Sequence, residues 1–204
     1  MVFGIDREMP RVAMVARPER FGAVLDRYDR AAAMAVKGVE SLVVLRSGVA
    51  VVASNTWAAR QAQQALKTSW KGGARVSSAE LLASLGRLLP RSDLAQTVEK
   101  AGESGVPSLE RVYQLPMLAQ CPLEPLSCTV SVSATRCELW VGTQTPDAIL
   151  AVAARMTGLP PEQIQLHDEP TGGSFGRRLA LDFIIEALEL GIQLQQPVKV
   201  VWSR

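Results

Sequence analysis

The residues that could do chemistry gather in one glycine-rich segment, Thr171–Arg178, with the sequence TGGSFGRR. It follows a short alternating run and precedes a helical pattern. Glycines there let the chain turn tightly and aim backbone N–H groups at one spot, where a helix dipole also favours negative charge. The segment therefore indicates a cradle for an anion, a phosphate or an oxo ligand, with a structural tight turn as the alternative. Its GGxxG spacing matches neither the P-loop nor the GxGxxG dinucleotide pattern.

Other reactive side chains are few. His167 is the single histidine, which excludes a two-histidine zinc site on this chain. We expect His167 to be a strand residue with a local hydrogen bond. Cys121, Cys128 and Cys137 are spaced C-x6-C-x8-C without any CxxC pair. Iron–sulfur, zinc-ribbon and thioredoxin sites are therefore disfavoured, and three partly buried free thiols are expected.

Composition describes an ordinary globular chain. Its 204 residues are 48% hydrophobic and 21% charged, which suits one or two domains. The net charge of +2, without a basic cluster interleaved with aromatics, gives no reason to expect nucleic acid as a partner. No apolar run reaches the roughly 18 residues of a membrane helix, and no secretory signal is recognisable. The compartment stays open between cytoplasm and periplasm.

The elements that must position the glycine-rich segment can be predicted from periodicity and caps. Asn55 and Ser77 or Ser78 are helix N-caps, and Thr145-Pro146-Asp147 is a helix start that Gly158 ends. A later helix with Leu181, Ile184, Ile185 and Leu188 inward should end at Gly191. The predicted strands are Arg11–Ala16, Ser41–Leu45, Val49–Ala53, Thr68–Trp70, Leu109–Leu115, Cys128–Ser133, Cys137–Val141, Ile164–Leu166 and Val198–Trp202, and further helices are Ala31–Val36 and Ser92–Ala101. This order predicts an α+β fold in two lobes.

Several segments together resemble one known family. GGSFGRR resembles the GGxFGxK/R loop of the molybdenum hydroxylases of the xanthine oxidase and aldehyde oxidase family. RVYQLPMLAQCPLEPLSCTV, CELWVGTQTPDAILAVAARMTGLPPEQIQLH and QPVKVVWSR are similar to further segments of that family, in the family's order. FGIDREMP, ARPERFG and SGVAVVASNTWAARQA look like its hammerhead-like domain. Within the family, the chain looks most like the isoquinoline 1-oxidoreductase and membrane-linked aldehyde dehydrogenase type.

The resemblance implies a division into domains. Residues 1–75 would form a small hammerhead-like α/β domain, and residues 76–108 a connector with helices. Residues 109–204 would form the first part of a molybdenum-cofactor-binding α+β domain.

The resemblance also implies roles for individual residues. Gln144 matches the glutamine that hydrogen-bonds the oxo ligand of molybdenum, although an ordinary cap at a strand end is the alternative. Phe175 and Gly176 match backbone donors to the same centre, and Gly172, Gly173 and Ser174 complete that loop. Arg177 either faces cofactor phosphate or pairs with an acid such as Asp182. Glu124, in the Glu-Pro pair, is expected to hydrogen-bond a neighbouring loop.

The implied function is that of part of the cofactor-binding subunit of an oxidoreductase, which hydroxylates aldehydes or N-heteroaromatics with oxygen from water. The implied cofactor is molybdopterin in its cytosine dinucleotide form. The implied partners are a small iron–sulfur subunit, the missing C-terminal molybdenum domains and a cytochrome c as electron acceptor. No nucleic acid and no membrane span are expected.

No residue matches the family's general-base glutamate, so we assign neither a catalytic residue nor a metal ligand to this chain. We expect the chain alone to be inactive and to bind no cofactor. Two alternatives remain: a non-catalytic binding or interaction domain that retains the fold, and a stand-alone binder of anions or nucleotides that uses the glycine-rich segment.

Overall fold

The computed structural model describes residues 11–88, 111 and 113–203. The chain divides into two compact units, one made of Met1–Gly73 with Gln120–Arg204 and the other of Ala74–Ala119. Within the parts described, no helix has both the length and the apolar character needed to cross a membrane.

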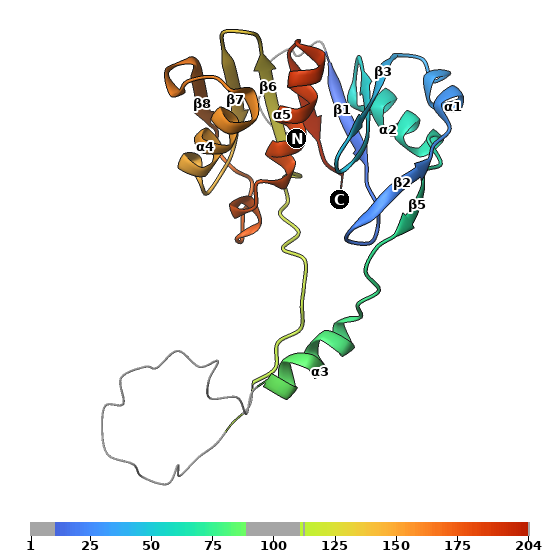
Figure 1. The fold of residues 1–204 in the computed structure, drawn as a ribbon, viewed down its shortest axis with the longest axis vertical. Coiled ribbons are helices and arrows are strands. Elements are labelled where there is room, and N and C mark those ends of the chain that lie inside the picture. The colour runs from blue at the N-terminus through green and yellow to red at the C-terminus, as the bar shows by residue number, and fades with distance from the viewer. Residues whose placement is uncertain (1–10, 89–110, 112, 204) are drawn as a thin grey trace. The chain divides into compact units, whose positions relative to one another are not determined.

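The first unit is built on a seven-stranded sheet with the order β3-β4-β1-β9-β6-β7-β8 (Figure 1). β1 pairs with β4 in antiparallel and with β9 in parallel orientation, with Val12 opposite Lys199. One sheet therefore contains strands from both the predicted hammerhead-like domain (1–75) and the predicted cofactor-binding domain (109–204). The division of the chain into these domains stays a prediction. The strands are β1 (Val12–Ala16), β3 (Val39–Leu45), β4 (Gly48–Ala53), β6 (Ser127–Val132), β7 (Cys137–Val141), β8 (Ile164–Asp168) and β9 (Val198–Val201).

Helices and a small second sheet complete this unit. β2 (Ala23–Arg27), which sequence patterns did not indicate, pairs with β5 (Ser69–Gly72). The helices are α1 (Arg30–Met34), α2 (Thr56–Ala65), α4 (Pro146–Thr157) and α5 (Asp182–Leu194), with short 3-10 helices at Pro161–Gln163 and Arg177–Leu179. Apart from β2 and the two 3-10 helices, each of these elements lies where the sequence predicts it within a few residues.

Local capping explains several helix ends. The Asn55 side chain accepts the N–H of Ala58 at 2.9 Å, as predicted for an N-cap. Gly158 ends α4 in the left-handed conformation, also as predicted. The predicted end of α5 at Gly191 is wrong, because the helix continues to Leu194 and is capped by Gln195. Gly191 instead lies so near β6 that a Cβ would be 3.1 Å from a Val130 methyl, so this glycine serves helix–sheet packing.

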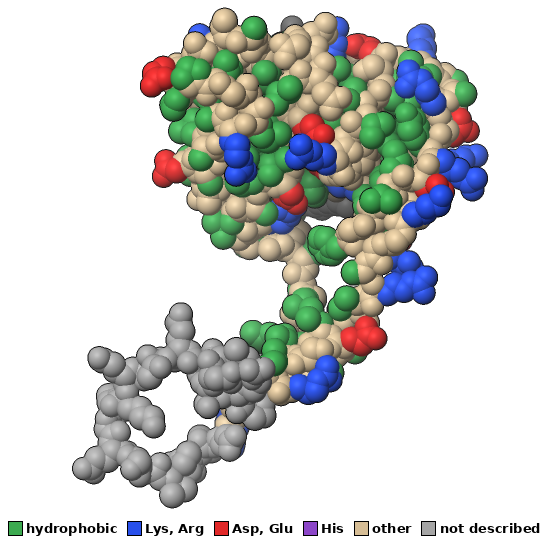
Figure 2. All heavy atoms as spheres, viewed as in Figure 1, with side chains coloured by type: hydrophobic (Ala, Val, Ile, Leu, Met, Phe, Trp, Pro, Cys, Tyr) green, Lys and Arg blue, Asp and Glu red, His purple; other side chains and the backbone are tan. Residues whose placement is uncertain are grey.

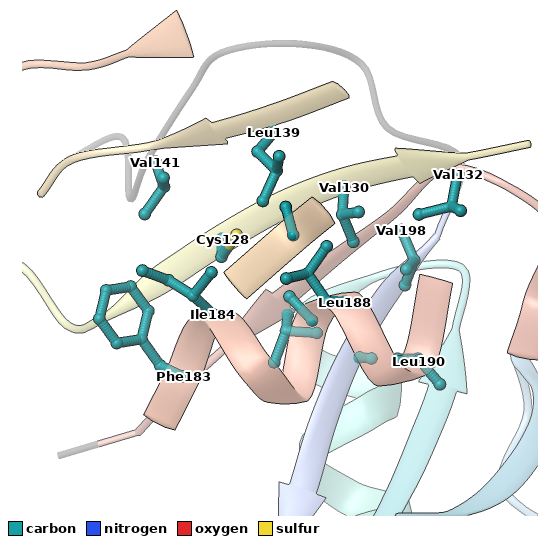
Figure 3. Packing of buried hydrophobic residues seen from close by; sticks show 14 of the residues in the cluster. Cys128, Val130, Val132, Leu139, Val141, Phe183, Ile184, Leu188, Leu190 and Val198 are labelled. Carbon is teal, nitrogen blue, oxygen red and sulfur yellow. The ribbon is translucent and has the colours of Figure 1, made fainter. Parts of the chain in front are cut away.

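The main hydrophobic core lies between α5, α4 and the sheet. Figure 3 shows Phe183, Ile184 and Leu188 of α5 facing Cys128, Val130 and Leu139 of the sheet. β4 is buried at every position because its alternate residues join different clusters, one that includes α5 and others that include α2. β4 is thus covered on both faces of the sheet.

The second unit contains α3 (Ser78–Leu88), which is capped by mutual hydrogen bonds between Ser77 and Glu80. Hydrophobic side chains lie on its surface, and the helix buries none of its residues (Figure 2). The predicted strand at Leu109–Leu115 is wrong where it can be tested: residues 111 and 113–115 lie in no strand, and Tyr113 and Leu115 are exposed, without sheet packing. The predicted helix at Ser92–Ala101 lies outside the described residues.

The three thiols should differ sharply in reactivity. Burial raises the pKa of Cys137 to about 11 and raises that of Cys128 further, whereas Cys121 is exposed. Because the thiolate is the reactive form, a thiol reagent at a pH of about 8 should modify Cys121 alone in the folded chain. Mass spectrometry after a timed pulse should find Cys128 and Cys137 labelled only when denaturant is added. Labelling of all three at similar rates without denaturant would contradict this packing.

Candidate functional site

The candidate site lies at one edge of the sheet, where parallel strands end. β7 and β8 are parallel, so Gly142–Thr145 after β7 and the loop after β8 leave the sheet on the same side. The backbone N–H of Gln144 donates to the carbonyl of Arg178 at 3.4 Å. The structure therefore brings the Gln144 segment beside the glycine-rich loop, at the kind of strand edge where open sheets bind ligands.

The glycine-rich loop has an unusual backbone. Gly173, Phe175 and Gly176 have φ values of 103°, 51° and 82°. Successive N–H groups in turn conformations can form concave nests that bind anions. Within the described structure, no acceptor is found for the N–H groups of residues 173–176. The loop therefore offers unused donors, which suit an oxo group or a phosphate.

The donors belong to the loop and not to the helix after it. A 3-10 turn at Arg177–Leu179 separates the loop from α5, which begins at Asp182. The carboxylate of Asp182 accepts the N–H of Phe183 at 3.0 Å and so occupies the start of that helix. The loop thus precedes a helix, as predicted, but does not open directly into it, and the Asp182 carboxylate already interacts with the positive end of the α5 dipole.

Arg177 makes one of its two expected contacts. Its guanidinium donates two hydrogen bonds to Asp182, at 2.9 and 2.7 Å. It also lies 5.1 Å from the ring centroid of Trp202. A contact between Arg177 and cofactor phosphate stays a prediction.

Gln144 itself is exposed, and only its backbone is engaged. No hydrogen bond of its side-chain amide is found among the described residues. The predicted helix start beside it is present, although the Thr145 side chain makes no capping bond. The Gln144 amide is therefore free to meet a ligand placed over the loop.

Glu124 and Arg178 lie beneath the loop. Glu124 Oε2 accepts the N–H of Gly172 at 2.6 Å, which confirms the expected bond to a neighbouring loop. It also accepts from Arg178 Nη2 at 3.0 Å, and Arg178 is only 1% exposed. Burial lowers the pKa of Arg178, while the Glu124 charge opposes that shift. The sequence does not indicate this role for Arg178, because its only signal is its place after Arg177 in the glycine-rich segment.

A second polar cluster lies at the same edge of the sheet. Arg17 follows β1 and pairs through two nitrogens with Glu186 of α5. Trp202, which follows β9, donates from its indole to Glu186 at 3.0 Å and stacks under the Arg17 guanidinium at 3.7 Å. These contacts compensate the buried Glu186 charge and fix the ends of two neighbouring strands.

His167 lies in β8, as predicted, but the expected local hydrogen bond is not present. Its ring stacks on Trp140 with centroids 4.9 Å apart, and its Nε2 has no hydrogen-bond partner within the described structure, although a carboxylate oxygen of Glu138 lies 3.9 Å away. No group of three or more His, Cys, Asp or Glu side chains that could hold a metal ion is found in that part of the chain either.

Comparisons with known proteins show which proteins this chain is similar to. The family described as "Molybdopterin cofactor-binding domain" matches residues 90–204. The chain is 30% identical to isoquinoline 1-oxidoreductase subunit beta of Brevundimonas diminuta, over 99% of this chain and 28% of that protein. It is 26% identical to a membrane-bound aldehyde dehydrogenase [pyrroloquinoline-quinone] of Gluconacetobacter polyoxogenes, over 100% of this chain and 29% of that protein. The chain thus spans less than a third of these curated relatives.

A solved structure shows the same fold. CO dehydrogenase from Oligotropha carboxidovorans superposes with a TM-score of 0.68 at 16% identity, covering 100% of this chain and 33% of that one. The predicted α+β class is confirmed by this likeness. The family match covers more than half of the chain. The chain therefore belongs to the molybdopterin cofactor-binding family of the molybdenum hydroxylases.

Proposed function

We propose that this chain supplies part of the cofactor site of an oxidoreductase that hydroxylates aldehydes or N-heteroaromatic compounds with oxygen derived from water. The observation that carries the proposal is the loop of residues 173–176, whose N–H groups lack described acceptors beside an exposed Gln144. The names of relatives support the two substrate classes, since one is an isoquinoline oxidoreductase and another an aldehyde dehydrogenase.

The residues present fit a molybdopterin cofactor, and we propose its cytosine dinucleotide form. When bound, the cofactor supplies the redox chemistry of the reaction. The N–H groups of Gly173, Ser174, Phe175 and Gly176 would donate hydrogen bonds to its oxo or phosphate oxygens, whereas the Gly172 N–H is already donated to the Glu124 carboxylate. The Gln144 amide would add a neutral donor without becoming a competing metal ligand. Arg177 would add positive charge at the end of the loop.

We propose further domains of the same subunit, a small iron–sulfur subunit and a cytochrome c acceptor as partners. The chain covers 28% of one relative and contains no residue matched to the family's general base. We therefore expect the chain alone to be inactive and free of cofactor. Tight binding of a nucleotide by the isolated chain, measured by calorimetry, would favour a stand-alone nucleotide binder instead.

Gln144→Ala tests the site in the longer protein, the cofactor-containing subunit to which we propose that this chain belongs. The change removes one side-chain donor and leaves the loop backbone intact. A hydrogen bond to a charged partner contributes about 1.5–3 kcal/mol, so turnover should fall about 10- to 150-fold if the bond acts in the transition state. Molybdenum per protomer, measured by elemental analysis, should stay near the wild-type value.

Gln165→Ala is the matched control, because Gln165 is exposed on β8 and accepts a bond from Arg136 away from the loop. It should change neither turnover nor metal content. Unchanged kcat in Gln144→Ala would show that Gln144 is not a donor to the reacting centre.

A further inference from the structure

Arg178 joins three segments of the candidate site through one buried side chain. Its Nε donates to the Gly173 carbonyl at 3.1 Å and its Nη1 to the Gly142 carbonyl at 3.2 Å. Its Nη2 donates to the carboxylate of Glu124 at 3.0 Å. Every guanidinium nitrogen is thus engaged, which the planar fork of arginine permits and a lysine ammonium does not.

Glu124 holds the other side of the same loop. Its carboxylate accepts the N–H of Gly172 at 2.6 Å, and its own backbone N–H donates to the Gly172 carbonyl at 3.2 Å. The two chain segments approach closely, since a Cβ on Gly172 would lie 2.6 Å from that of Glu124. The pair therefore binds the loop at two consecutive residues, Gly172 and Gly173.

These contacts set the direction of the unused donors. In a trans peptide, the carbonyl of one residue and the N–H of the next point in opposite directions, and no cis peptide is found among the described residues. The Gly172 carbonyl faces Glu124, so the Gly173 N–H points away from Glu124. The Gly173 carbonyl faces Arg178, so the Ser174 N–H points away from Arg178. Both donors are consequently aimed to the side opposite the buried pair.

The backbone of Arg178 extends the link to Gln144. Its carbonyl accepts the Gln144 N–H at 3.4 Å and the Thr143 hydroxyl at 3.5 Å. The same residue therefore contacts the loop through its side chain and the Gln144 segment through its backbone.

We propose that Arg178 and Glu124 are positioning residues, which hold the glycine-rich loop and Gln144 in ligand-binding geometry before any ligand arrives. The identity of the ligand that this geometry serves rests on the proposed function. The preorganisation itself is a property of the chain without ligand. An ordered set of donors binds its ligand without first losing conformational freedom.

The test measures backbone order by nitrogen-15 relaxation in the 204-residue chain without cofactor. Arg178→Lys keeps the charge and loses the fork, and Glu124→Gln keeps the size and loses the charge. In both variants the order parameters at residues 172–176 and at Gln144 should fall from about 0.85 to below about 0.6. Amides of β6 and β9 should not change.

Arg155→Lys is the matched control, because Arg155 is an exposed arginine of α4. It should leave the loop as ordered as in the wild type. Unchanged order of the loop in both variants would overturn the proposal. An equal loss of order throughout the sheet would also overturn it, because the pair would then be a general stability element.

A second arm uses the longer protein and measures molybdenum per protomer during dialysis. Loss of residues that orient the groups around a metal centre weakens binding about 10- to 100-fold, so Arg178→Lys should lose cofactor faster than Arg155→Lys. If the loop loosens while cofactor retention stays normal, positioning by Arg178 stands and the proposed role of the loop in cofactor binding fails.

Discussion

Phe183→Ala should lower the free energy of unfolding by about 3–5 kcal/mol, the usual cost of truncating a buried phenylalanine. Phe183 is 1% exposed and lies at the start of α5, where it packs into the main core below the candidate site (Figure 3). The cavity would open between α5 and the sheet, so α5 should lose much of its packing there. Urea unfolding followed by circular dichroism measures the change.

Phe21→Ala is the matched control, because Phe21 is 94% exposed. The same atoms are removed without a cavity, and the expected change is within about 0.5 kcal/mol. Equal effects of the two substitutions would mean that α5 does not pack on the sheet as described.

Gly176→Val should abolish most molybdenum incorporation in the longer protein. Gly176 has a φ of 82°, which a β-branched residue does not adopt without strain, and the change would turn the loop's donors away from their common target. Little blocks the new side chain sterically, since a Cβ there would meet only a Leu179 methyl at 4.0 Å. The expected loss is therefore one of backbone geometry, read as molybdenum per protomer by elemental analysis.

Gly158→Val separates this effect from general strain. Gly158 has a φ of 73° and lies at the end of α4, where a Cβ would meet no atom within 4 Å. Both variants should cost a similar amount of stability, of order 1–3 kcal/mol. Only Gly176→Val should lose metal. Full metal content in Gly176→Val would make the loop a structural turn.

Local signals in the sequence were sufficient for most elements. Asn55 and the Ser77–Glu80 pair cap their helices with the hydrogen bonds expected of those residue types. The turn between β3 and β4 likewise follows from two β-rich runs around a glycine. In each case the responsible atoms lie within a few residues of one another.

The errors have a common physical origin in contacts that are distant in the sequence. Gly191 has a local stop signal, but its packing against Val130 keeps it within α5. β2 is short and gains its structure only by pairing with β5. An arginine in a loop is usually exposed, because burying its charge costs free energy. Arg178 is buried because the Glu124 carboxylate and the surrounding carbonyls accept its hydrogen bonds and offset that cost. Sequence patterns report none of these partners.

The parallel pairing of β1 with β9 has a consequence for the order of folding. During synthesis, β1 can pair early with β4, because the two strands are close in the chain. The other edge of β1 pairs with β9, and this can happen only after Lys199 and Val200 have left the ribosome. By then the whole of the second unit has already been synthesised. Until then, the nascent chain presents an open strand edge of buried residues, and such edges recruit foreign strands. A chaperone that covers this edge of β1 until β9 has been made would therefore protect the chain during its synthesis.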